Sequence, residues 1–171
     1  YQNPWLRVRE DDVIRPDGGH GIYGVVEIRP SVGILAFNDR HELAIVGQWR
    51  YALGRYSYEI VRGGSAEGET DMLAAAKREL REEAGFEARH WEPLGSADVC
   101  NGVTTDVQHF FVARNLSFVG TNQDPFEEIA TEWHSFSRVL EMVLNGEMTE
   151  VCSVAAILKY DRMNSNGRER H

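Results

Sequence analysis

Three glutamates are crowded into one short stretch in the middle of the chain. Residues 77–86 read KRELREEAGF, so Glu79, Glu82 and Glu83 stand three and four positions apart. Residues at these offsets return to one face of a helix, where the carboxylates would repel one another. Arg78, four residues before Glu82, offsets only part of this charge. A divalent cation such as Mg²⁺, which prefers oxygen ligands, would relieve the repulsion.

The alternative interpretation is a solvated charged face, which is the more common case for a glutamate-rich helix. Two features favour the metal. The carboxylates adjoin the core margin, because next to them runs an apolar stripe of Leu73, Ala76, Leu80 and Ala84. Gly63 and Gly64 lie one loop upstream, where a bare backbone can approach a ligand and lend a carbonyl oxygen.

Strands are expected on both sides of this helix. Alternating apolar residues and turn formers predict them over residues 6–14, 22–28, 32–37, 43–50, 56–61, 91–99, 107–113 and 133–136. We expect the first two to pair and the next two to form a second hairpin. Helix formers over 70–84, stopped by Gly85, predict the central helix, and two closing helices are expected over 138–145 and 151–162. This order predicts a mixed α/β layered domain.

The composition limits the partners of this domain. With 171 residues and 42% hydrophobic content, the chain is long enough for one domain with its own core. A net charge of −9 argues against nucleic acid binding, which needs a basic face. No apolar run approaches the ~20 residues of a membrane span, and no signal peptide is recognised.

The two cysteines also bear on the compartment. Cys100 and Cys152 are too few for a disulfide framework and lack metal-ligand spacing. We therefore expect a reduced, cytoplasmic protein. The start at Tyr1 rather than methionine suggests a trimmed chain, which leaves open a preceding targeting segment.

The stretch from Arg78 to Phe86 resembles the second half of the Nudix box, the signature of the Nudix hydrolases. The full box reads G-x5-E-x7-R-E-U-x-E-E-x-G-U, where U is a bulky apolar residue. The required positions are filled without a gap by Arg78, Glu79, Leu80, Glu82, Glu83, Gly85 and Phe86. The agreement is specific, because charged, apolar and glycine positions all match.

The first half of the box departs by one residue. If Gly63 opens it, Glu69 takes the place of the early glutamate, but eight residues rather than seven separate it from the arginine. If Gly64 opens it, Thr70 stands where the glutamate belongs. We prefer Gly63 with one extra residue shortly before the helix, since residues 59–63 then resemble the Glu-Leu-Pro-Ala-Gly lead-in of one branch of the family.

That branch contains the ADP-ribose and nucleoside diphosphate sugar pyrophosphatases. Residues 47–51, GQWRY, resemble a strand end of the branch whose arginine reaches a substrate phosphate, and residues 101–106, NGVTTD, resemble one of its loops. Residues 127–133 resemble the stretch after its mobile catalytic loop, and residues 144–150 resemble a helix junction. The likeness covers roughly residues 4 to 160.

The resemblance implies a Nudix-type α/β/α sandwich with a mixed sheet and an N-terminal antiparallel strand pair. Residues 1–30 would form the strand pair, packed on or swapped with a partner subunit in a homodimer. Residues 31–163 would form the Nudix hydrolase domain, and residues 164–171 a loose polar tail.

The resemblance also implies a metal set. Glu79 and Glu83, with the Gly63 carbonyl, would hold a first Mg²⁺, and Glu82 would complete a site for a further ion. Mn²⁺ could replace Mg²⁺. Arg78 would orient the glutamates rather than touch the substrate.

Substrate contacts are implied for Arg50, which would clamp a phosphate, for Glu59 in the lead-in, and for Trp5, which would help to enclose the base. The bland alternatives are a surface salt bridge for Arg50 and core or dimer packing for Trp5. Glu82 and the loop residues Glu127 and Glu128 are the candidate general bases, although the loop pair could equally be an exposed acidic loop.

The function implied is metal-dependent hydrolysis of the pyrophosphate bond of ADP-ribose or a related nucleoside diphosphate sugar, which gives a nucleoside monophosphate and a sugar phosphate. Two alternatives stay open. One is a Nudix hydrolase of other diphosphates, such as dinucleoside polyphosphates or oxidised nucleoside triphosphates. The other is a non-catalytic module that senses nucleotides.

Overall fold

The computed structural model describes residues 1–121 and 129–168. Its strands are β1 (Leu6–Ile14), β2 (His20–Ile28), β3 (Ser31–Ala36), β4 (Glu42–Arg50), β5 (Arg55–Gly64), β6 (Phe86–Asp98), β7 (Val107–Phe118) and β8 (Ala130–Ser135). Its helices are α1 (Met72–Ala84), α2 (Phe136–Leu144) and α3 (Val151–Arg168), with a short 3₁₀ turn at Tyr51–Leu53.

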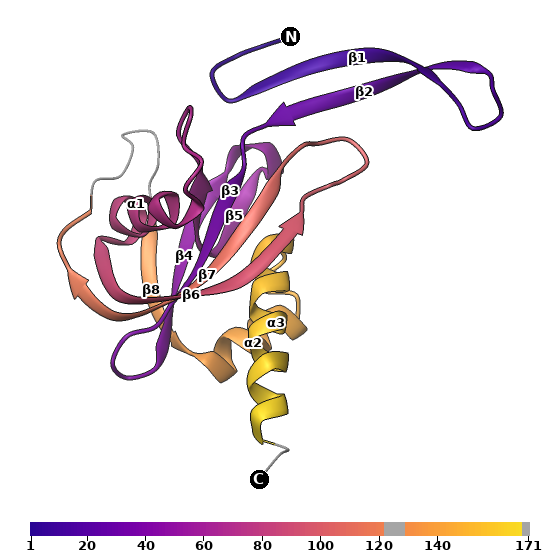
Figure 1. Ribbon diagram of the computed structural model, residues 1–171. Coiled ribbons are helices and arrows are strands. Elements are labelled where there is room, and N and C mark those ends of the chain that lie inside the picture. Colours follow the sequence, from indigo (N-terminus) through magenta and orange to yellow (C-terminus); the bar gives the residue numbers. More distant parts are fainter. Residues whose placement is uncertain (122–128, 169–171) are drawn as a thin grey trace.

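A six-stranded mixed sheet lies between the helices (Figure 1), in the order β6-β7-β3-β5-β4-β8. Neighbouring residues of one strand point to opposite faces. Ile34 and Val61 therefore pack in the core cluster that contains the buried residues of α1, while Leu35 and Ile60 pack in the one that contains α2 and α3. The predicted α/β/α arrangement with a mixed sheet is confirmed.

The expected hairpin of residues 32–37 and 43–50 is wrong. The chain does reverse over Asn38 to Glu42, but β3 and β4 share only the isolated bridge Phe37–Leu43 before they diverge. β5 enters between them and pairs antiparallel with both, and β3 takes β7 as a parallel partner on its other side. All six residues of β3 are buried, as expected for a strand enclosed between two neighbours.

Local signals explain both ends of α1. The Asp71 side chain accepts hydrogen bonds from the backbone amides of Leu73 (3.0 Å) and Ala74 (3.2 Å), which caps the N-terminus. Gly85 ends the helix in the left-handed conformation at φ 76°, as predicted for this glycine. The helix therefore begins two residues later than expected and stops where expected.

The last helix is longer than predicted. α3 continues to Arg168, six residues beyond the expected end at Arg162, so the predicted loose tail is helical from 164 to 168. Polar residues carry this extension, where the Asn164 side-chain amide donates to the Tyr160 carbonyl at 2.8 Å.

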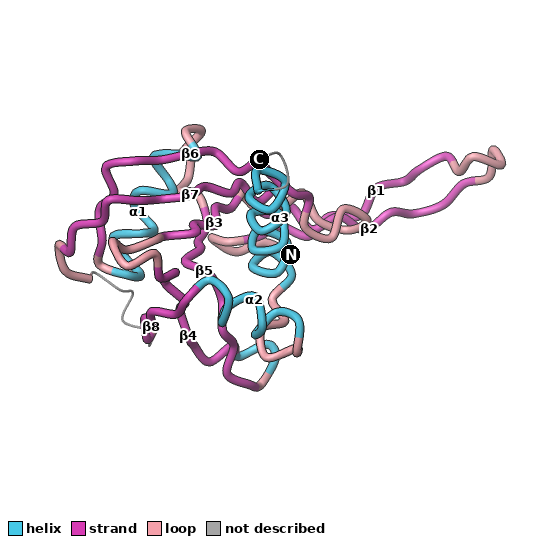
Figure 2. The backbone as a smooth tube through the Cα atoms, turned by 90° about the horizontal axis from the view of Figure 1, so that it is seen from below, coloured by secondary structure: helices cyan, strands magenta, loops and turns pink. Residues whose placement is uncertain are grey.

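The N-terminal strand pair projects from the body of the molecule (Figures 1 and 2). β1 and β2 pair antiparallel over nine residue pairs and form a sheet of their own, which confirms the predicted pair. The loop of residues 100–106 fastens β2 to the body. The Val26 amide donates to the Val103 carbonyl at 2.8 Å, and the Tyr23 hydroxyl donates to the Gly102 carbonyl at 2.6 Å.

Candidate active site

The acidic face of α1 is turned toward the sheet. Glu79 and Glu83 are one turn apart, and only 8% and 7% of their surfaces are exposed. Glu82 lies further out, with 37% of its side chain exposed. Two carboxylates at the margin of a core have lost most of their water, so they need polar partners there.

Gly63 lies directly against this face. A Cβ built on Gly63 would come within 2.1 Å of the Glu79 carboxylate. This distance is too short for any residue with a Cβ, so only glycine fits here without a shift of the carboxylate. Gly64 has open space at the same position. The close approach of bare backbone and carboxylate therefore belongs to Gly63, the residue expected to open the box.

Arg78 connects the carboxylates. Its guanidinium donates to Glu79 at 2.6 Å, to Glu82 at 2.9 Å and to Glu69 at 3.1 Å, and also to the Gly64 carbonyl at 2.8 Å. Burial disfavours the charge on Arg78, but its hydrogen bonds and charge contacts with the three glutamates outweigh burial and raise its pKa above the ordinary value. Arg78 thus lies where an orienting residue should.

The extra residue in the box does not displace the early glutamate. The Glu69 carboxylate reaches Arg78 and also accepts from the Ala66 amide at 2.8 Å. That backbone hydrogen bond and Arg78 lower the pKa of Glu69, against a smaller effect of burial. Glu69 therefore joins the same cluster as Glu79 and Glu82, in agreement with Gly63 as the start of the box.

Arg50 and Glu59 face each other across β4 and β5. Two nitrogens of the Arg50 guanidinium contact the Glu59 carboxylate, the closest of them at 2.5 Å, and Glu59 is 1% exposed. Burial raises the pKa of Glu59, but hydrogen bonds and charge from Arg50, with help from Ser57 and Arg62, outweigh it and leave the pKa below its usual value. Glu59 therefore fixes the position of Arg50, whose side chain is 32% exposed.

Arg62 links this pair to α1 and had no role in the sequence analysis. Its backbone amide donates to Glu83 at 3.1 Å, and its guanidinium lies 3.6 Å from Glu59 and 3.2 Å from Glu150. Glu150 in turn accepts from the first amides of α3, those of Cys152 and Ser153. The position of Arg62 next to Gly63 was the signal available in the sequence, but its ion-pair partner Glu150 lies 88 residues further along the chain.

Trp5, the remaining predicted residue that the structure describes, is not part of this cluster. Trp5 is 70% exposed and lies just before β1, where it lines a groove with Pro4, Arg29 and Pro30. Glu127 and Glu128 lie outside the described residues. The structure thus brings Gly63 and Arg78 together with the box glutamates, and it pairs Arg50 at the end of β4 with Glu59 on β5.

The donor set around Gly63 fits a hard divalent cation. Within residues 1–121 and 129–168, no three histidine, cysteine, aspartate or glutamate side chains converge closely enough to hold a metal ion alone. Glu79 and Glu83 nonetheless offer carboxylate oxygens from adjacent turns, and the glycine leaves its backbone accessible beside Glu79. Mg²⁺ commonly completes a small protein set with water and substrate oxygens, so two carboxylates suffice.

Comparison with known proteins settles the family. The NUDIX domain family matches residues 27–151, and the nucleoside diphosphate sugar hydrolase N-terminal domain family matches residues 1–26. The chain belongs to the Nudix family. The first match spans the whole candidate site, and the second spans nearly all of the projecting strand pair.

Relatives of this Nudix protein include two described as ADP-ribose pyrophosphatase. The one from Mycobacterium tuberculosis is 32% identical over 154 residues, which cover 88% of this chain and 74% of the relative. The one from Bacillus subtilis is 28% identical over 134 residues, which cover 78% and 69%. A methanol dehydrogenase activator from Bacillus methanolicus is 30% identical over 128 residues, with 72% and 69% covered. The predicted family and enzyme class, a Nudix pyrophosphatase, are confirmed.

A solved structure shares the fold. A crystal structure of an ADP compounds hydrolase superposes with a TM-score of 0.85 at 20% identity, and the match covers 100% of this chain and 92% of that one. In the part of the chain that the structure describes, none of the helices has the length and apolar character needed to cross a membrane.

Proposed function

We propose that this Nudix protein hydrolyses the pyrophosphate bond of ADP-ribose or a related nucleoside diphosphate sugar, in a metal-dependent reaction that gives a nucleoside monophosphate and a sugar phosphate. The observation that carries the proposal is the buried pair Glu79 and Glu83, in which Glu79 lies against the bare backbone of Gly63 and Glu83 accepts from the neighbouring Arg62 amide. The substrate class is supported by the two relatives described as ADP-ribose pyrophosphatase.

Glu79 and Glu83, with the Gly63 carbonyl, would hold the first Mg²⁺ or Mn²⁺, and Glu82 would help to hold a further ion. When bound, such an ion neutralises phosphate charge and acidifies a bound water. The acidic α1 face would then no longer repel a diphosphate, which resolves the conflict between a chain of net charge −9 and an anionic substrate.

The other residues bind and orient. Arg50 would clamp a phosphate oxygen, since Glu59 already holds its guanidinium in place and leaves it partly exposed. Arg78 would keep the carboxylates in position through its contacts with Glu79 and Glu82. A glutamate, either Glu82 or one of the loop residues Glu127 and Glu128, would take the proton from the attacking water.

We also propose that the protein is a cytoplasmic homodimer in which residues 1–30 pack on, or swap with, the partner, while residues 31–163 form the hydrolase domain. The projecting strand pair carries several exposed apolar side chains, among them Trp5, Ile14 and Ile22. A single subunit leaves these side chains in water, and a second copy would cover them. Trp5 would then help to enclose the base of the substrate.

A substrate panel tests the proposal. The purified chain is incubated with ADP-ribose, other nucleoside diphosphate sugars, a dinucleoside polyphosphate and an oxidised nucleoside triphosphate, with Mg²⁺, Mn²⁺ or EDTA. Mass spectrometry of the products should show a nucleoside monophosphate and a sugar phosphate from the first two, and no product in EDTA. Tight binding without turnover would instead identify a sensing module.

A further inference from the structure

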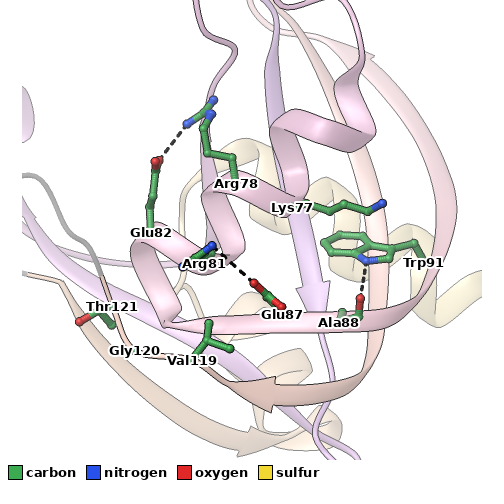
Figure 3. A pocket seen from close by; sticks show the side chains of 10 residues that line it. All are labelled: Lys77, Arg78, Arg81, Glu82, Glu87, Ala88, Trp91, Val119, Gly120 and Thr121. Carbon is green, nitrogen blue, oxygen red and sulfur yellow. Dashed lines mark hydrogen bonds and ion pairs between the residues drawn. The ribbon is translucent and has the colours of Figure 1, made fainter.

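A cavity lies beside the part of α1 that carries Lys77 and Arg81. It has a volume of about 780 Å³ and is lined by residues of α1, of the first half of β6 and of the segment 119–121 (Figure 3). Its lining includes Lys77, Arg81 and Trp91, and it borders the candidate active site through Arg78 and Glu82. Small-molecule sites in proteins commonly have volumes of roughly 300–1,000 Å³, so the cavity is large enough for a nucleotide.

Two of the three cations that line this cavity, Lys77 and Arg81, are weakly engaged by the described residues, whereas Arg78 is held by the glutamates of the candidate active site. Lys77 forms no hydrogen bond or ion pair with any described residue. With the residues that the structure describes, Arg81 forms one ion pair, to Glu87 at 3.5 Å, and both side chains are more than half exposed. Exposed ion pairs of this kind contribute little free energy, so Arg81 can exchange Glu87 for an anionic ligand at low cost. Lys77 and Arg81 stand one turn apart, so they offer two positive charges on one side of the helix in a chain of net charge −9.

Trp91 supplies a fixed planar surface beside these charges. Its indole nitrogen donates to the Ala88 carbonyl at 3.0 Å, and its ring packs edge-on against Phe111 at 6.3 Å. In Figure 3 the Lys77 side chain extends alongside the indole. The indole is thus fixed by Ala88 and Phe111 and also lines the cavity, so it is suited to stack with a planar group there.

We propose that this cavity binds a nucleoside monophosphate without a metal ion, with the base against Trp91 and the phosphate between Lys77 and Arg81. The choice of this ligand rests on the proposed function, because a nucleoside monophosphate is a product of that reaction. Through Arg78 and Glu82 an occupant of the cavity would lie next to the carboxylates of the candidate active site.

Binding of AMP in EDTA tests the proposal, since EDTA removes metal-dependent binding at the acidic face. The indole amide signals of the full chain are followed in ¹H–¹⁵N spectra during the titration, with the Trp91 signal assigned from Trp91→Phe. The Trp91 signal should shift and saturate. The double variant Lys77→Met/Arg81→Gln should lower the affinity for AMP, measured by calorimetry, on the order of tenfold or more.

The matched control is Lys159→Met/Arg162→Gln. These two exposed cations belong to α3, which packs on the face of the sheet opposite to α1 and the cavity. This variant should bind AMP like the wild type, while adenosine and inorganic phosphate should each bind wild type more weakly than AMP. The proposal is overturned if AMP at about 10 mM leaves the Trp91 signal in place, or if both double variants bind equally. Hydrolysis of the substrate panel fails or succeeds independently of this result, because the binding test uses neither metal nor turnover.

Discussion

At the scale of single residues, the tightest steric constraint of the candidate site lies between Gly63 and Glu79. We predict that Gly63→Ala destabilises the fold by about 1–3 kcal/mol, because the new methyl group would overlap the buried Glu79 carboxylate. Chemical denaturation with a circular dichroism readout measures the difference in unfolding free energy. Gly64→Ala is the control, since a Cβ there meets no atom within 4 Å. Equal loss in the two variants would contradict the close approach at Gly63.

The charge of Glu83 carries the proposed metal site. We predict that Glu83→Gln lowers turnover by roughly 100-fold or more, since even residues one step removed from a metal can cost 10–100-fold. The amide keeps an oxygen that can accept from the Arg62 backbone, so the fold should persist. Steady-state kinetics on the best substrate of the panel measures the loss.

Glu67→Gln is the control for this variant, because Glu67 is an exposed glutamate of the preceding loop with no assigned role. It should retain wild-type turnover. An independent check is the melting temperature, which millimolar Mg²⁺ should raise in the wild type and raise less in Glu83→Gln, because a ligand of the native state stabilises it. A wild type indifferent to Mg²⁺ would argue against the metal site.

At the scale of elements, Ser153 joins α3 to the sheet where β5 changes partner. Its buried hydroxyl accepts from the Ile60 amide at 3.0 Å and donates to Glu150 at 2.7 Å. We predict that Ser153→Ala costs about 1–3 kcal/mol, because the buried Ile60 amide would lose its acceptor. Denaturant unfolding measures this, with the exposed Ser117→Ala as a near-neutral control. If both variants unfold alike, the Ile60 contact contributes little.

Elements governed by neighbouring residues could be predicted from the sequence. α1 carries its own apolar stripe and its own stop at Gly85, and β1 and β2 are joined by a run of turn formers. The pairing of β5 with both β3 and β4 could not be predicted, because it depends on contacts between strands and not on the pattern within any one of them.

The candidate site follows the same division. Glu79, Glu82, Glu83 and Arg78 share one helix, so their spacing revealed them. Arg62 escaped notice because its meaning comes from contacts with Glu83 on α1 and with Glu150 before α3, which the sequence separates by 67 residues. The close fit at Gly63 likewise exists only once β5 and α1 pack together.

At the scale of the whole molecule, the strand pair of residues 1–30 is expected to form the dimer contact. Ile14 and Ile22 are 65% and 66% exposed and are diagonal neighbours on β1 and β2. We predict that Ile14→Ser/Ile22→Ser shifts the protein from dimer toward monomer, because the variant removes apolar area that a partner would cover. Sedimentation equilibrium across a dilution series measures the shift.

Leu144→Ser is the control for the dimer, since Leu144 is 73% exposed at the end of α2, far from the strand pair in sequence. It should leave the association constant unchanged. A wild type that sediments as a monomer at all concentrations, or a dimer indifferent to both variants, would remove the proposed role of the strand pair.

The double membership of β5 has a consequence for how the body of the protein comes apart. Residues Arg55 to Ile60 pair with β4, and residues Val61 to Gly64 pair with β3. One continuous strand therefore joins the two halves of the six-stranded sheet, β4–β8 on one side and β3–β7–β6 on the other. Neither half of the sheet can separate from the other without breaking its backbone hydrogen bonds with β5. The body should therefore melt in a single cooperative step, whereas β1 and β2, which within one subunit are held to the body through one loop, should fray first when the subunits are apart.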